Sequence, residues 1–378
     1  MEVTMRKLLL TFLLFNAMNA HAVIAAPDFD VTSYILIDAD SGVVLAEKNA
    51  DKRIEPASVT KMMSAYVVDE ALVNGEISPN HWVLISQNAA QVEGTRMGVT
   101  PNSKVRVEDL YKGMIIVSGN DASIALAEFI AGSEKDFSVL MNEEAARLGM
   151  VNSNFMNATG LPNADHYSTA RDLAVLSRAL IKDYPDLYPQ YSEESFTYKG
   201  EKKPNSNVLL KMDPSVDGIK TGYTKAAGYC LVSSAKRGDM RLIAVVMGSK
   251  TLEGRSDYSL SLLNYGFDNY ETHKLYAANT PVSSLPLWMG QENQFNVGVT
   301  EDLYVTIPRG EYQNIQASLN VPPVVKAPVA QQQTYGNLQL TLHQQTLIDK
   351  PLVALNPVAE GAWWKNTYDY FKLAFVES

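Results

Sequence analysis

The sequence is poor in cysteine and has no cluster of histidines, and these two shortages narrow the chemistry that the chain can carry. Cys230 is the single cysteine among 378 residues, so the chain has no internal disulfide. It lies in the apolar run Tyr229–Val232, which predicts a buried, unreactive side chain. The five histidines are scattered and form no His-Glu-x-x-His motif, so a zinc peptidase is disfavoured.

Runs of basic residues are also missing, and the apolar run near the N-terminus is too short to span a bilayer. The formal net charge is −10, which disfavours nucleic acid as a partner. Arg6 and Lys7 precede the apolar run Leu8–Phe15. Ala20-His21-Ala22 is a small-x-small cleavage site, and Ala25-Ala26 is the alternative. Residues 1–26 are therefore predicted to be a signal peptide, and the mature chain is expected to be exported.

The order of the remaining patterns predicts a large α+β domain over residues 27–276. Apolar strands are expected at 33–38, 43–48, 229–235 and 241–247, and helices near 61–72, 108–117, 122–131, 137–148, 169–182 and 251–269. Strands followed by helices and then strands indicate an antiparallel sheet with helices packed on it. Thr169–Asp172 is interpreted as a capping box, and residues 186–217 are expected to be irregular. His166 either faces a cleft or, as a loop histidine, bonds the backbone.

The pattern changes near residue 277, where apolar and polar residues begin to alternate. The alternating segments are Leu303–Ile307, Ile315–Val321 and Leu338–Leu342. They predict a small all-β domain over 277–355, a sandwich without catalytic residues that serves as a spacer or docking module.

Residues 356–378 are predicted to hold an amphipathic helix, Trp363–Val376. One face carries Trp364, Tyr368, Phe371 and Phe375, while Lys365, Asp369 and Lys372 lie away from it and Leu373 falls outside the apolar face. Such a helix suits the plane of a membrane surface and is too short and polar to span it. The alternative is a helix docked on the β-domain.

Ser58 and Lys61 stand three residues apart, where Pro56 and a run of helix formers predict the start of a helix. Residues i and i+3 share a helix face, so the Ser58 hydroxyl and the Lys61 amine are expected to meet. A serine attacks only when a base takes its proton, and lysine is that base only when burial and a second cation lower its pKa. The pattern alone is common on surface helices, so further motifs must support it.

Two further motifs, Ser118-Gly119-Asn120 and Lys220-Thr221-Gly222, follow in order. Three motifs of this kind in this order occur in class A β-lactamases and penicillin-binding proteins. With the residues that flank the motifs, the chain resembles the low-molecular-mass penicillin-binding proteins, the D-alanyl-D-alanine carboxypeptidases of the penicillin-binding protein 5 and 6 type. The resemblance is carried by Pro56–Met63, Ser118–Ala122 and Asp217–Thr224, and it covers essentially the mature chain.

The resemblance implies a β-lactamase- or transpeptidase-like fold and a serine peptidase that removes the terminal D-alanine from peptidoglycan pentapeptide stems. It implies Ser58 as the acyl-ester nucleophile, Lys61 as the general base, and Ser118 as a proton relay that bridges Lys61 and Lys220. The substrate-binding residues it implies are Asn120, Lys220, Thr221, Gly222 and Tyr223, with the peptide added along an exposed strand edge. β-Lactams are expected as covalent inhibitors, and no metal or organic cofactor is expected.

Two positions depart from the pattern of some relatives. Ser206 stands where some relatives carry an arginine that helps to bind the substrate carboxylate. Lys220 and Thr221 are therefore expected to contribute more to binding that carboxylate. Tyr223 stands where some carry a histidine, although only its backbone is needed for an oxyanion hole shared with Ser58.

Three other functions compete with this hypothesis. A class A β-lactamase would need a Glu-x-x-x-Asn segment between the second and third motifs, and Glu143, Glu144, Glu193 and Glu194 have no asparagine at that offset. A non-catalytic wall-binding or shape-determining protein could keep the fold, although all the catalytic residue types are present. A transpeptidase would share the acyl-enzyme. The expected location of the exported protein is the periplasmic face of the inner membrane, to which the C-terminal amphipathic helix attaches it peripherally.

Overall fold

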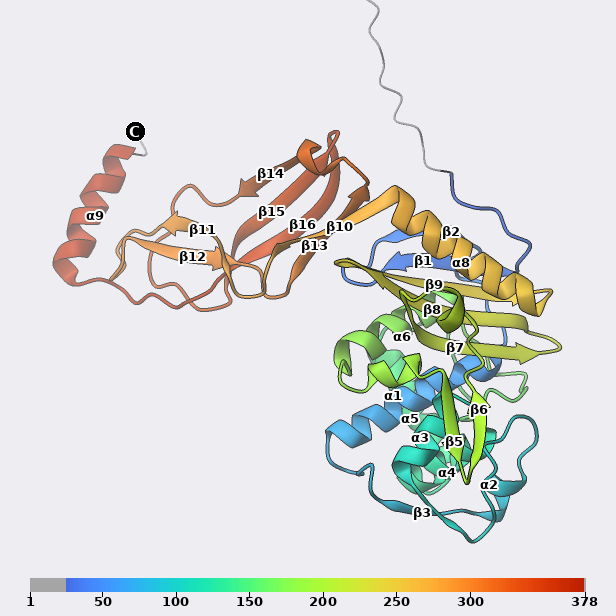
Figure 1. The fold of residues 1–378 in the computed structure, drawn as a ribbon. Helices are drawn as coiled ribbons and strands as arrows, with labels where there is room; N and C mark the ends of the chain where they lie inside the picture. The colour runs from blue at the N-terminus through green and yellow to red at the C-terminus, as the bar shows by residue number, and fades with distance from the viewer. Residues whose placement is uncertain (1–24, 377–378) are drawn as a thin grey trace, which may run out of the picture.

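The computed structural model describes residues 25–376, so the signal peptide expected over 1–26 lies almost entirely outside the described residues. A large N-terminal domain carries a smaller β-rich domain at one end, and helix α9 (Trp363–Val376) lies at the far end of the latter (Figure 1). The two domains have separate hydrophobic cores. The predicted α+β domain, β-domain and C-terminal helix are therefore all present in the expected order.

An antiparallel sheet in the order β2-β1-β9-β8-β7 divides the first domain. Its strands are β1 Ser33–Asp38, β2 Val44–Lys48, β7 Val216–Thr224, β8 Gly228–Arg237 and β9 Met240–Ser249. Alternate residues of β1 enter different cores, since Leu36 packs with helix α8 (Leu252–Asn269) and Ile35 with the helical block on the other face. Burial on both faces explains the long apolar runs within β1, β8 and β9.

The helical block surrounds α1 (Lys61–Val73), which begins directly after the 3₁₀ turn η1 (Ala57–Thr60). The other members are α2 Gln87–Gln91, α3 Val107–Ile115, α4 Asn120–Ala131, α5 Glu134–Arg147 and α6 Ala170–Asp183. A two-stranded antiparallel sheet of β3 Trp82–Leu84 and β4 Lys104–Arg106 accompanies them. Because α3, α4, α5 and α6 all contact α1, the helix is buried from Lys61 to Asp69. The first turn of α1 therefore lies in the protein interior.

Two local expectations about the first domain were wrong. Residues 186–217 are not irregular: they form η2 Tyr188–Ser192, the hairpin of β5 Ser195–Tyr198 and β6 Glu201–Pro204, and α7 Leu209–Met212. Positive φ at Lys199 and Gly200 gives the hairpin its tight turn, while the charged strand β6 has no apolar alternation to detect. The expected capping box at 169–172 is incomplete: Thr169 caps α6, but the Asp172 carboxylate bonds the backbone of Asn152 and the Ser153 hydroxyl.

The second domain begins with β10 (Tyr270–Tyr276), which pairs with β13 (Leu303–Pro308) before the boundary expected at 277. Its five-stranded sheet has the order β11-β12-β16-β15-β14. The strands are β11 Pro281–Pro286, β12 Gln294–Gly298, β14 Ile315–Asn320, β15 Thr334–Leu342 and β16 Gln345–Ala354. β10 is half polar, so its sequence resembles the end of the preceding helix more than a buried strand.

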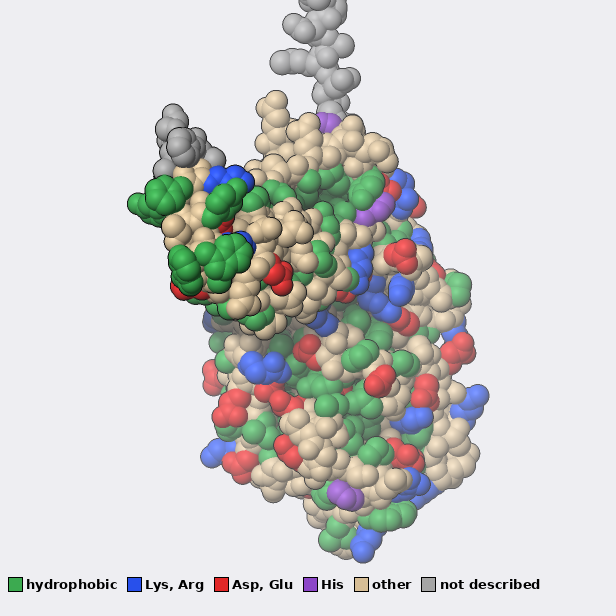
Figure 2. All heavy atoms as spheres, turned by 90° about the vertical axis from the view of Figure 1, so that its left-hand side faces the viewer, with side chains coloured by type: hydrophobic (Ala, Val, Ile, Leu, Met, Phe, Trp, Pro, Cys, Tyr) green, Lys and Arg blue, Asp and Glu red, His purple; other side chains and the backbone are tan. Residues whose placement is uncertain are grey.

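Helix α9 both docks on the second domain and exposes aromatic side chains. The Asp369 carboxylate accepts a hydrogen bond of 2.8 Å from the Met289 backbone N–H, and Leu373 on the same face is buried. The opposite side exposes 62% of Trp364, 63% of Tyr368 and 62% of Phe371. Figure 2 shows hydrophobic side chains standing out at this end of the molecule. The side chain of Phe375 lies outside the described residues. Within residues 25–376, none of the helices combines the length and apolar character needed to cross a membrane.

Candidate active site

The three motifs come from distant segments and meet beside the first turn of α1. Ser58 lies in η1 and Lys61 begins α1, while Asn120 is the first residue of α4. Lys220, Thr221 and Gly222 lie on β7, whose free side forms the edge of the sheet. Gly222 packs closely on η1, because a Cβ there would lie 3.0 Å from the Pro56 carbonyl oxygen. The third motif therefore lies on the edge strand of the sheet, as expected, although its three residues are buried.

Lys61 is fully buried and its amine has three partners. Its Nζ lies 3.2 Å from Ser58 Oγ and 2.7 Å from Asn120 Oδ1. The third partner is the Thr159 carbonyl oxygen at 2.6 Å. A neutral amine has two N–H donors and one lone pair, so it can donate to both carbonyl oxygens and accept from the Ser58 hydroxyl. The geometry thus fits a lysine that removes the serine proton.

Electrostatics favour that neutral form. Burial lowers the pKa of Lys61 well below its usual value, and the positive charge of Lys220 lowers it further, against smaller opposing effects of Asp121 and Glu134. Burial, and then the charge of Arg255, lower the pKa of Lys220 to about 7. The site therefore holds two buried lysines whose charged forms are both disfavoured.

The side chains around Lys220 define the sheet edge. Lys220 Nζ donates to the Thr221 carbonyl oxygen at 3.1 Å, and the Thr221 hydroxyl lies 2.7 Å from Ser206 Oγ. Tyr223 exposes 54% of its surface and its ring packs on Tyr229 with centroids 4.4 Å apart. Ser206, noted in the sequence as a departure from some relatives, thus holds the Thr221 hydroxyl.

Ser118 and Asn120 are placed differently from their expected roles. Ser118 is buried with φ of 65°, a conformation that non-glycine residues rarely adopt. Among the described residues, Lys61 contacts Asn120 rather than Ser118, so the expected bridge from Ser118 to both lysines is not formed here. Asn120 Nδ2 also donates to the Glu93 carbonyl at 2.7 Å, so both ends of its amide are engaged within the protein.

Three groups at this site were not found from the sequence. The Thr159 carbonyl was missed because any residue type can supply a backbone oxygen; only the neighbouring Gly160 hinted at close packing. Arg255 lies within helix α8 without a motif, although its guanidinium donates to the Gly222 carbonyl at 3.4 Å. Asp121 accepts three backbone N–H groups from residues 97–99 and so fixes the loop next to Asn120.

Comparison with known proteins agrees with this geometry. Residues 19–251 match the peptidase S11 family, described as D-alanyl-D-alanine carboxypeptidase, and residues 270–360 match the penicillin-binding protein 5 C-terminal domain. The chain is 41% identical over 358 residues to D-alanyl-D-alanine carboxypeptidase DacA of Escherichia coli K12, covering 92% of this chain and 89% of the relative. It is 40% identical over 368 residues to DacC of the same strain, covering 95% and 92%.

Solved structures of penicillin-binding proteins are also similar to this chain. Penicillin-binding protein 5 from Haemophilus influenzae superposes with a TM-score of 0.86 at 38% identity, covering 89% of this chain and 99% of that one. Penicillin-binding protein D2 from Listeria monocytogenes, solved in an ampicillin-bound form, gives a TM-score of 0.60 at 33% identity, covering 64% and 99%.

Proposed function

Because this chain belongs to the peptidase S11 family of D-alanyl-D-alanine carboxypeptidases, we propose that its reaction passes through an acyl-enzyme on Ser58. The protein is a serine-type penicillin-binding peptidase that removes the terminal D-alanine from peptidoglycan stem peptides. One observation carries the assignment of the nucleophile: a buried lysine with a lowered pKa lies 3.2 Å from the Ser58 hydroxyl.

In the first step, Ser58 Oγ attacks the carbonyl carbon between the two D-alanines while Lys61 takes the hydroxyl proton. The backbone N–H groups of Ser58 and Tyr223 receive the oxyanion, and such a donor typically contributes about 3 kcal/mol to the barrier reduction. Lys220 and Thr221 bind the terminal carboxylate, because the stem peptide lies along the free edge of β7. Asn120 binds a backbone amide of the stem after exchanging one of its internal hydrogen bonds.

In the second step, the C–N bond breaks and the leaving amine receives the proton held by Lys61. The proton passes through the Ser118 hydroxyl, which must first take the place beside the Lys61 amine that Asn120 occupies in this structure. Water then enters, Lys61 removes one of its protons, and hydrolysis of the ester frees the shortened stem and restores Ser58. A β-lactam forms the same ester but retains its leaving group, so release of the penicilloyl group is expected to be slow. Turnover of nitrocefin faster than about 10 per second, an ordinary enzyme rate, would favour a β-lactamase instead.

The assignment is tested with the purified mature protein and a peptide ending in D-Ala-D-Ala, by measuring free D-alanine. Wild type is expected to release it and Ser58→Ala to release none. Mass spectrometry after exposure to penicillin is expected to place one adduct on Ser58. Full release by Ser58→Ala would eliminate the mechanism, and inactive wild type that takes up no penicillin would favour a non-catalytic wall-binding protein. Adding an amine acceptor distinguishes a transpeptidase, which would join the shortened stem to it.

We also propose that α9 holds the exported protein on the periplasmic face of the inner membrane. The exposed Trp364, Tyr368 and Phe371 suit the headgroup region, and the docked face keeps the helix attached to the second domain. Co-sedimentation with anionic lipid vesicles tests this proposal. Deletion of residues 361–378 is expected to abolish binding; unchanged binding would refute it.

The division of the chain is part of the same proposal. Signal-peptide cleavage is expected near residue 26 and the anchor over 356–378. The peptidase domain, expected over 27–276, and the β-domain, expected over 277–355, meet at β10, and we place the junction near residue 270 because β10 already pairs with β13 of the β-domain. N-terminal sequencing of the exported protein and limited proteolysis test these boundaries. Cleavage within a core strand rather than between the domains would contradict them.

A further inference from the structure

We propose that His166 is a positioning residue for the catalytic lysine, acting through Thr60 and the backbone segment 156–160. The inference deepens the proposed function, because it takes Lys61 to be the base. His166 is 2% exposed, and its Nε2 lies 2.8 Å from Thr60 Oγ1, in the turn that joins Ser58 to Lys61. Its other ring nitrogen, Nδ1, lies 3.3 Å from the Met156 backbone nitrogen. The imidazole ring therefore joins the two segments that lie beside Lys61, the turn η1 and the backbone segment 156–160.

The hydrogen bonds fix the tautomer of the ring. The Met156 N–H can only donate, so Nδ1 accepts and the proton of a neutral ring lies on Nε2, which donates to the Thr60 hydroxyl. The ring packs edge-on against Phe155, with centroids 5.7 Å apart. Burial lowers the pKa of His166 to about 4, which keeps the ring neutral at the pH where the enzyme works.

The segment that His166 holds supplies a partner of the lysine amine. The Thr159 carbonyl accepts a hydrogen bond from Lys61 Nζ at 2.6 Å, and the Ala158 carbonyl accepts one from Ser64 Oγ at 2.7 Å. Gly160 lets the segment approach η1, because a Cβ there would lie 1.8 Å from the Ala57 oxygen and 2.9 Å from Thr60 Oγ1. The segment and the turn are therefore in direct backbone contact.

Charged groups reach this region from the other side of the segment. The Glu134 carboxylate accepts from the Ala158 N–H at 3.0 Å, and its charge acts on Lys61 together with those of Asp121 and Lys220. The uncharged His166 ring thus holds segment 156–160 against η1. Without that ring, the Thr159 carbonyl could move away from the Lys61 amine. A displacement of about 1 Å at a catalytic group can cost up to about a hundredfold in rate.

Two pairs of variants separate positioning from simple stability. His166→Gln keeps an N–H donor near the place of Nε2, whereas His166→Asn is too short to reach Thr60. Thr60→Ser keeps the hydroxyl, whereas Thr60→Val removes it at constant shape. The measurements are the second-order rate constant for acylation by a fluorescent penicillin at a series of pH values, and the melting temperature of each protein.

We expect His166→Asn and Thr60→Val to acylate about tenfold to a hundredfold more slowly per folded molecule. The acidic limb of their pH profiles should move to higher pH, because water reaching the loosened pocket raises the pKa of Lys61. His166→Gln and Thr60→Ser should recover most of the rate. The double variant His166→Asn/Thr60→Val should be no slower than the slower single variant, because the two substitutions remove the same hydrogen bond, the one between Thr60 and His166.

Wild-type rates and an unmoved acidic limb in the folded His166→Asn and Thr60→Val proteins would overturn the proposal. A lower melting temperature with an unchanged rate per folded molecule would also overturn it, as would multiplicative losses in the double variant. If His166→Asn does not fold, Thr60→Val decides alone. The proposed function fails separately, when wild type itself forms no acyl-enzyme on Ser58.

Discussion

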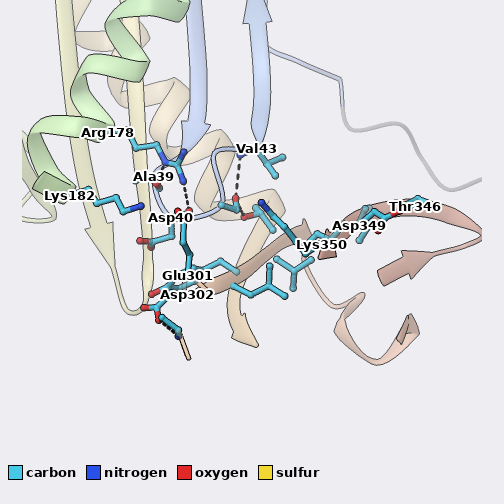
Figure 3. A pocket seen from close by; sticks show the side chains of 18 of the residues that line it. Ala39, Asp40, Val43, Arg178, Lys182, Glu301, Asp302, Thr346, Asp349 and Lys350 are labelled. Carbon is cyan, nitrogen blue, oxygen red and sulfur yellow. Dashed lines mark hydrogen bonds between the residues drawn. The ribbon is translucent and has the colours of Figure 1, made fainter. Parts of the chain in front are cut away.

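The carboxylate of Asp38 at the end of β1 accepts a hydrogen bond of 2.7 Å from the hydroxyl of Thr272 in β10, and this buried contact joins the two domains. Asp38 also accepts from the backbone N–H groups of Asp40 and Ser41. The hydroxyl of Thr306 lies 2.9 Å from that of Thr272 and 2.6 Å from that of Ser41. The turn after β1 is therefore shared between the domains, next to a cavity of about 1020 Å³ lined by both (Figure 3).

Removal of the Thr272 hydroxyl is expected to weaken this junction without affecting catalysis. Thr272→Val leaves the buried Asp38 carboxylate with one partner fewer, which should lower the free energy of unfolding by about 1–3 kcal/mol. Thermal unfolding measures the loss, and small-angle scattering should show a wider range of domain orientations. Thr341→Val, on a strand of the same domain, is the control and should change neither. A Thr272→Val protein with wild-type stability and scattering would show that the contact does not hold the domains together.

The two lysines predict a bell-shaped pH dependence of kcat/KM for peptide hydrolysis. Lys61 acts as a base only when neutral, and its pKa is lowered, so the rate falls as pH drops through that lowered value. Lys220 attracts the substrate carboxylate only when charged, and its pKa in the free enzyme is about 7, so kcat/KM falls as pH rises through that value. Lys220→Gln removes the cation, which should raise the pKa of Lys61 and move the acidic limb to higher pH.

Lys220→Arg is the control for this prediction, because it keeps the charge. Its acidic limb should stay close to that of wild type even where the overall rate falls. An acidic limb that stays in place in Lys220→Gln would mean that burial alone sets the pKa of Lys61.

Gly160 and Gly149 offer a matched test of the close contact beside Lys61. Both have positive φ, of 82° and 78°, so alanine at either position carries the same backbone cost of roughly 1 kcal/mol. At Gly149 a Cβ meets no atom within 4 Å, whereas at Gly160 it lies 1.8 Å from the Ala57 oxygen. Gly160→Ala should therefore lower the rate of acylation by penicillin at least about tenfold, because the turn that holds Ser58 must shift.

Gly149→Ala should acylate at the wild-type rate with a slightly lower melting temperature. Equal acylation rates for the two alanine variants would show that the contact between segment 156–160 and η1 does not matter for the chemistry.

The residues of the site that could be predicted from the sequence are those whose side chains form motifs with a recognisable spacing and order. Ser58, Lys61, Asn120 and Lys220 were found because their spacing and order suit one reaction. The structure brings Ser58 and Asn120 within hydrogen-bond distance of Lys61, while the catalytic roles of these residues stay predictions. The Thr159 carbonyl could not be found this way, since hydrogen bonding by a backbone oxygen leaves no trace in residue type. His166 was expected either to face a cleft or to bond the backbone, and it does accept a hydrogen bond from the Met156 N–H. Its contact with Thr60 could not be found, because the two residues are remote in sequence and only the fold brings them together.

The elements of the fold with a strong apolar pattern could be predicted from the sequence, whereas the polar elements could not. The sheet strands β8 and β9 are long, apolar and joined by a short turn, so local sequence determines them. The β5–β6 hairpin is polar and exposed, and β10 is recognised as a strand only through its pairing with β13. Such elements depend on long-range contacts rather than on their own apolar pattern.

The two faces of α9 should respond differently to substitution. Phe371 is 62% exposed and Leu373 is 4% exposed, although they are two residues apart on the helix. Phe371→Ser should leave the melting temperature unchanged and weaken binding to anionic vesicles about tenfold or more, because burying a phenylalanine contributes about 2 kcal/mol.

Leu373→Ala should instead weaken docking of the helix on the second domain by about 2 kcal/mol, seen as faster proteolysis or hydrogen exchange in α9. It should leave vesicle binding largely intact, because the apolar face is kept. The reverse pattern, in which Leu373→Ala releases the protein from vesicles and Phe371→Ser does not, would assign the aromatic face to some partner other than a membrane.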